Sequence, residues 1–337
     1  MIHWLLALAQ TLLFIAMAPL LLGWIKRMKC HMQNRAAPSL WQPYRDFAKL
    51  FRKHVVLAEQ ASWIFRATPY IVFGATVLGA AVVPLVAVNL PTDVIADVIV
   101  LVGFFSLARF FTALAGMDIG TAFGGMGASR DMMIGALAEP VLLMAVFTMA
   151  MTASTTNLSE ATTYTLNSGL VLRPSFIFAM LGLMMVAVAE TGRVPVDNPA
   201  THLELTMVHE AMILEYSGRH LALIEWAGQI KLMIYMVLIA NVFFPWGIAT
   251  QLVAKDLGVG LVVIAGKLVL LGVVLVVQDT VMQAFGPQNI LGPRAPGLRV
   301  LEGRTRVGHR PRAAIGRGPC SGRVRFRVDP AADRHEP

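Results

Sequence analysis

Seven long apolar stretches constrain the fold of this chain more than any other feature of its sequence. They cover roughly residues 2–24, 67–90, 94–115, 133–153, 170–189, 224–248 and 257–277. About 20 apolar residues in a helix cross the roughly 30 Å hydrocarbon core of a bilayer. Because lipid offers no hydrogen-bond partners, the spanning segments must satisfy their own backbone groups. The sequence therefore predicts an all-α, polytopic transmembrane bundle over residues 1–282.

The composition agrees with a membrane protein and excludes a metal site of the common cysteine-rich kinds. Of the 337 residues, 56% are hydrophobic and only 14% are charged. The two cysteines, Cys30 and Cys320, lie far apart and outside any Cys/His cluster. We therefore expect no iron–sulfur cluster or structural zinc in this chain, and any redox centre would belong to a partner.

The distribution of charge predicts the topology. Residues 26–66 contain nine Lys and Arg but only two acidic residues, whereas residues 154–168 contain no Lys or Arg. By the positive-inside rule, the first of these segments lies in the cytoplasm and the N-terminus outside. The predicted cytoplasmic loops are then residues 25–66, 116–132 and 190–223, in a bacterial or archaeal inner membrane. Lipid attraction is the simplest explanation of the basic first loop.

The last 55 residues, 283–337, differ from the rest. They contain 11 Arg and four acidic residues, are rich in Gly and Pro, and have no span-length apolar run. This composition predicts a disordered tail. Nothing upstream offers a nucleic-acid-binding fold, so the tail does not predict nucleic acid as a partner.

The segment 116–132 contains five glycines together with Asp118, Arg130 and Asp131. Its composition predicts a flexible loop with close backbone approach. It lacks the G-K-[ST] ending and the preceding strand of a phosphate-binding loop, which argues against nucleotide binding.

Residues 189–231 contain the densest group of ionisable side chains. A proton path needs groups that exchange protons at the membrane boundary, and a solvated helix face is the simpler alternative. On an ideal helix over Ala200–Tyr216, ended by Gly218, Glu204 and Glu215 lie within roughly 20° of each other. The proton-path candidates here are Glu190, Asp197, Glu204, Glu210, Glu215 and Lys231, with Arg193 and Arg219 as counter-charges or docking residues. His209 and Glu210 begin a zincin-like motif, but Ile213 stands at the second histidine position, so no zinc site is expected.

Four ionisable residues fall inside or near the predicted spans: Arg109, Glu139, Lys231 and Lys267. Such residues are costly in lipid and usually face the bundle interior. Glu139 joins the proton-path candidates because Pro140 can open its helix to water. For Arg109 the alternatives are a counter-charge and snorkelling to lipid phosphate; for the two lysines they are function, snorkelling or ion pairing. Arg130 is a further counter-charge or docking candidate.

Three passages resemble a known family. They are LWQPYRDFAKLFRK (40–53), DIGTAFGGMGASRDMMIGALAEP (118–140) and the AETGRVPVDNPATHLELTMVHEAMILEYSGRH segment that begins at Ala189. Over about residues 1–280 the chain is similar to the membrane subunit of formate hydrogenlyase and group 4 [NiFe] hydrogenases. That subunit is homologous to subunit 1 (the H subunit) of respiratory NADH:quinone oxidoreductase.

The resemblance implies an eight-helix bundle, docked beneath a peripheral electron-transfer arm. It implies hydrogenase large and small subunits, an iron–sulfur protein and antiporter-like membrane subunits as partners, which hold the NiFe centre and the iron–sulfur clusters. Quinone-using relatives form the floor of a quinone chamber in the same region. The eighth helix should begin near Ala284, where the Arg-rich tail stands instead, and we hypothesise a frameshift near residue 280.

The predicted function is a non-catalytic subunit of an oxidoreductase complex. It would anchor a hydrogenase or formate-hydrogenlyase-like complex and carry a proton path. One alternative is a quinone-site subunit of an NADH:quinone oxidoreductase-like complex. A second is a stand-alone ion or solute transporter, which the lack of a visible inverted repeat argues against.

Overall fold

The computed structural model describes residues 2–34, 36–58, 60–88, 97–168, 174–193, 208–248 and 254–284. The regular elements within these ranges are all helices, and Asp97 and Asn157 form an isolated antiparallel bridge. The helices are α1 (Ile2–Met32), α2 (Gln42–Arg52), α3 (Trp63–Val82), α4 (Val98–Asp118), α5 (Ala122–Ala153), α6 (Leu158–Ser168), α7 (Pro174–Glu190), α8 (His209–Ile213), α9 (Gly218–Phe243) and α10 (Ala254–Ala284). The prediction of an all-α bundle is confirmed.

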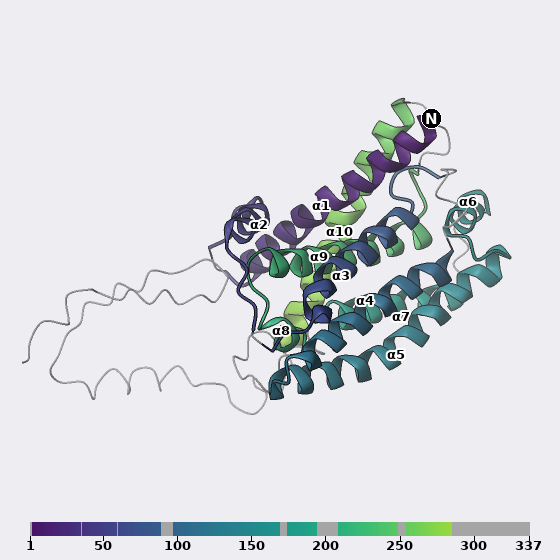
Figure 1. Cartoon of the computed structure of the whole chain (residues 1–337). Coiled ribbons are helices and arrows are strands. Elements are labelled where there is room, and N and C mark those ends of the chain that lie inside the picture. Colours follow the sequence, from purple (N-terminus) through teal and green to yellow (C-terminus); the bar gives the residue numbers. More distant parts are fainter. Residues whose placement is uncertain are drawn as a thin grey trace, which may run out of the picture.

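Each of the seven predicted spans overlaps a helix, although α3 ends at Val82 and α9 at Phe243, before the predicted ends at 90 and 248. Six helices, α1, α3, α4, α5, α9 and α10, are long and apolar enough to cross a bilayer, and α7 is a shorter apolar helix of 17 residues. Successive long helices run in opposite directions, so that α2 and α8 lie at one end of the bundle and α6 and the N-terminus at the other (Figure 1).

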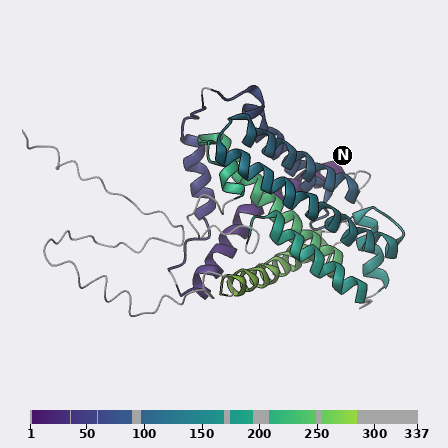
Figure 2. The same ribbon diagram turned by 90° about the horizontal axis from the view of Figure 1, so that it is seen from below.

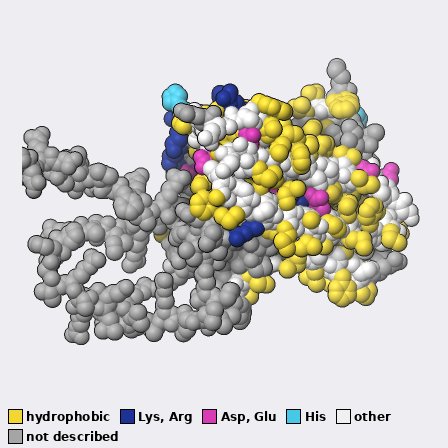
Figure 3. Space-filling model, turned by 60° about the horizontal axis from the view of Figure 1, so that its bottom comes forward, with side chains coloured by type: hydrophobic (Ala, Val, Ile, Leu, Met, Phe, Trp, Pro, Cys, Tyr) yellow, Lys and Arg dark blue, Asp and Glu magenta, His cyan; other side chains and the backbone are white. Residues whose placement is uncertain are grey.

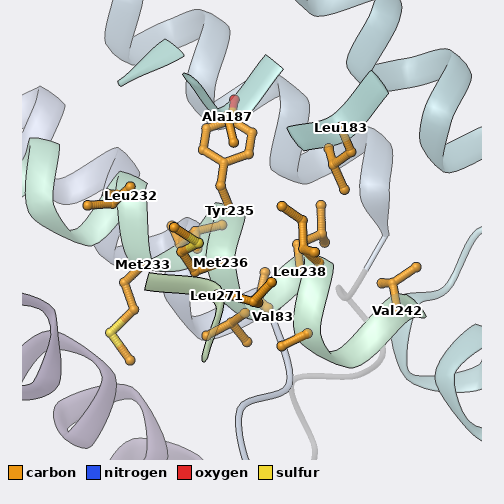
Figure 4. Packing of buried hydrophobic residues seen from close by; sticks show 14 of the residues in the cluster. Val83, Leu183, Ala187, Leu232, Met233, Tyr235, Met236, Leu238, Val242 and Leu271 are labelled. Carbon is orange, nitrogen blue, oxygen red and sulfur yellow. The ribbon is translucent and has the colours of Figure 1, made fainter. Parts of the chain in front are cut away.

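Helix α9 forms the centre of the bundle. It contacts α1, α3, α7 and α10 along its length, while α4 and α5 pack beside α3 and α7 (Figures 1 and 2). Its residues from Leu232 to Phe243 are all buried, and Tyr235, Met236 and Leu238 pack against side chains of α7, α10 and the end of α3 (Figure 4). Apolar side chains on every face of a helix are expected where it is surrounded by protein.

The outer surface is largely hydrophobic. Large apolar side chains such as Met133, Met144, Met151 and Phe178 are exposed, and hydrophobic atoms cover much of the face in Figure 3. Basic side chains gather at the end of the molecule where α2 lies (Figure 3). An apolar band with basic residues at one end is typical of a bundle that sits in a bilayer.

The prediction of a long flexible loop over residues 116–132 is wrong. Helix α4 continues to Asp118 and α5 begins at Ala122, so the connection is only three residues long. The glycines allow close helix packing instead: a Cβ on Gly124 would overlap the carbonyl of Gly116, and one on Gly127 would lie 3.0 Å from the carbonyl oxygen of Val208. Small residues at such contacts let helix backbones approach each other.

The other two predicted loops also contain helix. Helix α1 extends to Met32 and α2 occupies Gln42–Arg52 within the first. In the second, only the five residues of α8 are helical within 208–217, and Gly218 begins α9 where it was expected to end a helix. Gly218 has φ +56°, and a Cβ there would lie 2.9 Å from the carbonyl oxygens of Lys53 and His54. The rest of that predicted helix, 200–207, and the tail beyond 284 lie outside the described residues.

Lys267 shows how a charged residue is accommodated in the apolar α10. Its Nζ donates a hydrogen bond to the carbonyl oxygen of Phe244, 2.5 Å away, immediately after the end of α9. The last carbonyls of a helix have no partner within it and carry partial negative charge, so a cation is favourable there. This helix-capping contact was not among the alternatives considered for Lys267, which were function, snorkelling and ion pairing.

Candidate functional site

Arg109 is the centre of a buried group of charges. It lies on α4, and its side chain is 7% exposed. Its guanidinium forms ion pairs with Glu139 of α5 at 2.6 Å and with Glu190 at the end of α7, and its Nε lies 3.9 Å from Asp131 of α5. Snorkelling to lipid phosphate, one alternative for Arg109, is therefore wrong: the side chain points into the protein and meets three carboxylates.

Lys231 of α9 completes the group. Its Nζ lies 2.6 Å from the second carboxylate oxygen of Glu190 and 5.7 Å from the ring centre of Phe105. Glu190 thus joins two cations on different helices, with each of its oxygens bound to one of them. We call Asp131, Glu139, Glu190, Arg109 and Lys231 the charge cluster.

The cluster runs from the interior toward the surface. Glu190 has a side-chain exposure of 3%, whereas Asp131 and Glu139 on α5 are 25% and 31% exposed. The exposed apolar residues Met132, Met133 and Leu137 surround them on the same helix. With all five groups ionised, the cluster has three negative and two positive charges, so its net charge is −1.

The helices that hold the cluster are continuous. α5 passes through Pro140 without interruption, so the expected opening of the helix at this proline is not seen. Helix α7 ends immediately after Glu190 in a glycine turn: Gly192 has φ +59°, its N–H donates to the carbonyl of Ala189, and the N–H of Arg193 donates to that of Val188. These paired hydrogen bonds are a Schellman ending, which sets the direction of the chain after the helix.

A second buried group of charges lies three residues beyond Glu190. Asp279 of α10 is 4% exposed; it pairs with Arg193 at 2.9 Å and with Lys29 of α1 at 3.6 Å. The acid therefore ties the end of α7 to α1 and α10. Burial lowers the pKa of Arg193, although the Asp279 carboxylate opposes this. A guanidinium remains charged even so, because its ordinary pKa is above 12.

Asp279→Asn is expected to lower the free energy of unfolding by about 3 kcal/mol, because removal of one partner leaves a buried charge uncompensated. Thermal or denaturant unfolding of the purified chain in detergent measures this. Asp256→Asn, in the first turn of the same helix, is the matched control and should change stability by less than about 0.5 kcal/mol. Equal stability of both variants would mean that the Asp279 group does not hold the three elements together.

The EYSG residues (215–218), which lie in the third passage that carries the resemblance, have a structural role in the fold. Tyr216 stacks on Phe65 with ring centres 3.9 Å apart and donates a hydrogen bond to the Phe65 carbonyl. Burial raises the pKa of Tyr216, which keeps the phenol protonated as a donor. Ser217 Oγ exchanges hydrogen bonds with both backbone groups of Val56. The start of α9 is thereby fastened to the segment between α2 and α3.

The structure brings together four of the predicted site residues: Arg109, Glu139, Glu190 and Lys231 form the charge cluster. Arg193 belongs to the second group. The remaining described candidates are exposed and lie outside both groups: Arg130, Glu210, Glu215 and Arg219. Asp197 and Glu204 fall outside the described residues.

Sequence reasoning did not select three residues of these groups: Asp131, Asp279 and Lys29. Of these three residues, Asp279 could have been found from the sequence, because it is a lone acidic residue at the end of an apolar run. Within the described residues no three His, Cys, Asp or Glu side chains are grouped so that they could hold a metal ion.

Comparisons with known proteins agree on the family. The family described as NADH dehydrogenase matches residues 5–290. Formate hydrogenlyase subunit 4 of Escherichia coli (strain K12) is 34% identical over 262 residues, which cover 78% of this chain and 84% of that protein. Hydrogenase-4 component C of the same strain is 32% identical over 276 residues, which cover 82% and 86%.

More distant relatives support the same family assignment and fold. The NADH-quinone oxidoreductase H subunit of Paraburkholderia phymatum is 27% identical over 67% of this chain and 66% of its own length. Among solved structures, the membrane-bound sulfane sulfur reductase, an archaeal respiratory membrane complex, contains a chain of the same fold. It has a TM-score of 0.66 at 19% identity, and the match covers 86% of this chain and 97% of that one. This chain therefore belongs to the NADH dehydrogenase family, whose members here are membrane subunits of redox complexes.

Proposed function

We propose that this chain is the membrane anchor and proton-path subunit of a hydrogenase or formate-hydrogenlyase-like complex. It would couple a peripheral redox arm to ion translocation across the membrane. The observation that carries the proposal is the charge cluster: five ionisable side chains from four helices, in a largely apolar bundle. Ionisable groups inside a membrane protein are costly and are typical of proton relays.

The geometry suggests different roles for the members of the cluster. Glu190 is the most buried carboxylate and binds both cations, so it would respond most strongly to a change of charge nearby. Glu139 and Asp131 lie nearer the surface of α5 and would exchange protons with water or with a neighbouring membrane subunit. Arg109 and Lys231 would hold the negative charge in place between transfers.

The remaining candidates would act at the cytoplasmic boundary. Glu210 and Glu215 are exposed near α8, at the end of the bundle where we place the cytoplasm, and with Asp197 and Glu204 they would deliver protons to the cluster. Arg130 and Arg219 would contact the peripheral subunits. The N-terminus would lie outside, and the membrane would be the inner membrane of a bacterium or archaeon.

The partners are proposed from the similarity to the formate hydrogenlyase and hydrogenase-4 proteins. They would be hydrogenase large and small subunits, an iron–sulfur protein and antiporter-like membrane subunits. The NiFe centre and the iron–sulfur clusters would reside in these partners. A frameshift would account for the Arg-rich tail. The family match extends to residue 290, which is past the boundary expected near 280. Sequencing the gene across this region tests the frameshift.

Purification of the tagged chain from membranes in mild detergent tests the proposal. Mass spectrometry of the co-purifying proteins and a hydrogen-uptake assay on the eluate are the measurements. We expect a nickel-containing large subunit and hydrogenase activity. A chain that purifies alone and transports ions or solutes by itself would contradict the proposal and favour a transporter.

A quinone site is the second candidate function, because the chain is also similar to the H subunits of NADH-quinone oxidoreductases. The same purification distinguishes it: NADH dehydrogenase subunits would then appear in the eluate. Saturable, inhibitor-sensitive quinone reduction that depends on the Glu190–Glu215 region would support this function.

A further inference from the structure

Gly135 occupies a special place in the charge cluster. α5 presents Asp131, Gly135 and Glu139 at intervals of four residues, which puts them on one face of the helix, a turn apart. The glycine therefore lies between the two carboxylates that Arg109 contacts from α4. A Cβ at position 135 would lie 2.6 Å from Cζ and 2.7 Å from Cδ of Arg109. Both distances are far shorter than van der Waals contact between carbon atoms.

Arg109 cannot avoid such a Cβ by a small movement. Its side chain is buried, and its guanidinium is held by Glu139 on one side and Glu190 on another. The planar fork of a guanidinium suits this arrangement, because its donors point in fixed directions toward two carboxylates. A shift away from α5 would lengthen at least one of these ion pairs.

We propose that Gly135 is a positioning residue of the charge cluster. Because it has no side chain, the guanidinium of Arg109 lies against the backbone of α5 and reaches Asp131, Glu139 and Glu190 together. The effect of Gly135 on proton transfer rests on the proposed function of the chain. Its effect on the position of Arg109 does not, so the two can be tested separately.

The test compares Gly135→Ala with two matched variants, Gly103→Ala on α4 and Gly125→Ala on α5. A Cβ at position 103 or 125 would meet nothing within 4 Å. All three changes replace a helical glycine by alanine and improve helix propensity alike. Only Gly135→Ala places an atom beside Arg109. A difference between this variant and the two controls therefore measures the effect of filling that space.

The functional measurement is proton translocation per electron transferred, with the purified complex in proteoliposomes. We expect Gly135→Ala to lower this ratio about 10- to 100-fold, the loss that a displacement of about 1 Å can cause at a reacting site. The two controls should stay within twofold of the wild type. A purely structural defect would reduce the amount of intact complex but not the ratio in the complex that remains.

The structural measurement is a cryo-electron microscopy map of the Gly135→Ala complex. We expect the Arg109 guanidinium to move away from Glu190 or Glu139, and an unmoved guanidinium overturns the proposal. A moved guanidinium with normal proton translocation supports the positioning role and contradicts the proposed function of the cluster. In an Arg109→Ala background, Gly135→Ala should cause no further loss; a further loss would show a packing role instead. If the Arg109→Ala complex does not assemble, the map alone decides.

Discussion

Replacing Arg109 with alanine is expected to destabilise the chain more than any other single substitution at the site. The change leaves Glu190, which is 3% exposed, with Lys231 alone, and it leaves Glu139 and Asp131 without their shared cation. Breaking one buried ion pair costs about 3–5 kcal/mol, because the other charge stays buried and uncompensated. We expect the loss here to reach at least that range. Unfolding of the purified chain in detergent, followed by circular dichroism, measures it.

Arg109→Lys separates the charge from the geometry. A lysine keeps the positive charge but is shorter and lacks the planar fork, so it should restore part of the stability and little of the coupled proton translocation. Arg45→Ala, exposed on α2, is the surface control and should change stability by less than about 0.5 kcal/mol. An Arg109→Ala chain as stable as the wild type would show that this arginine does not hold the carboxylates together.

The membrane spans could be predicted because hydrophobic length alone determines them. Each predicted span overlaps a helix; α10 extends past both ends of its predicted span, 257–277, whereas α3 and α9 end before theirs. The structure of the loops was harder to predict, because composition does not distinguish a glycine that makes the backbone flexible from one that allows close helix packing. Gly116 and Gly124 suggested flexibility in the sequence, whereas in the fold they face each other across the turn between α4 and α5. That use of glycine depends on a contact between helices, which residue types alone do not specify.

Four of the five members of the charge cluster could be selected one by one from the sequence, but their pairing could not. Arg109, Glu139, Glu190 and Lys231 each stood out as an ionisable residue in or beside an apolar run. They come from α4, α5, α7 and α9, so only the packing of four helices brings them together. Asp279 escaped selection because it follows the predicted end of its span by two residues. A boundary acid of that kind is ordinarily solvated, whereas this one is buried between Arg193 and Lys29.

Glu190→Gln is expected to abolish most of the coupled proton translocation. The substitution removes the one carboxylate that binds both Arg109 and Lys231, so both cations lose their common partner. A neutral amide cannot take up and release a proton at this position. We expect a loss of about 100-fold in proton translocation per electron, in the range that removal of a general acid–base group produces. The purified complex in proteoliposomes, with a pH-sensitive dye, gives the measurement.

Neutral substitutions of the three carboxylates in the cluster should lower the free energy of unfolding by different amounts, in a definite order. Glu190→Gln should destabilise the chain most, Glu139→Gln less and Asp131→Asn least. The reason is that Glu190 is buried with two ion pairs, Glu139 is 31% exposed with one, and Asp131 lies 3.9 Å from its partner. Glu215→Gln, on an exposed residue, is the matched control and should change stability by less than about 0.5 kcal/mol. If Glu215→Gln instead stops proton translocation while Glu190→Gln does not, the proton path follows the surface near α8 and the cluster serves to hold the helices together.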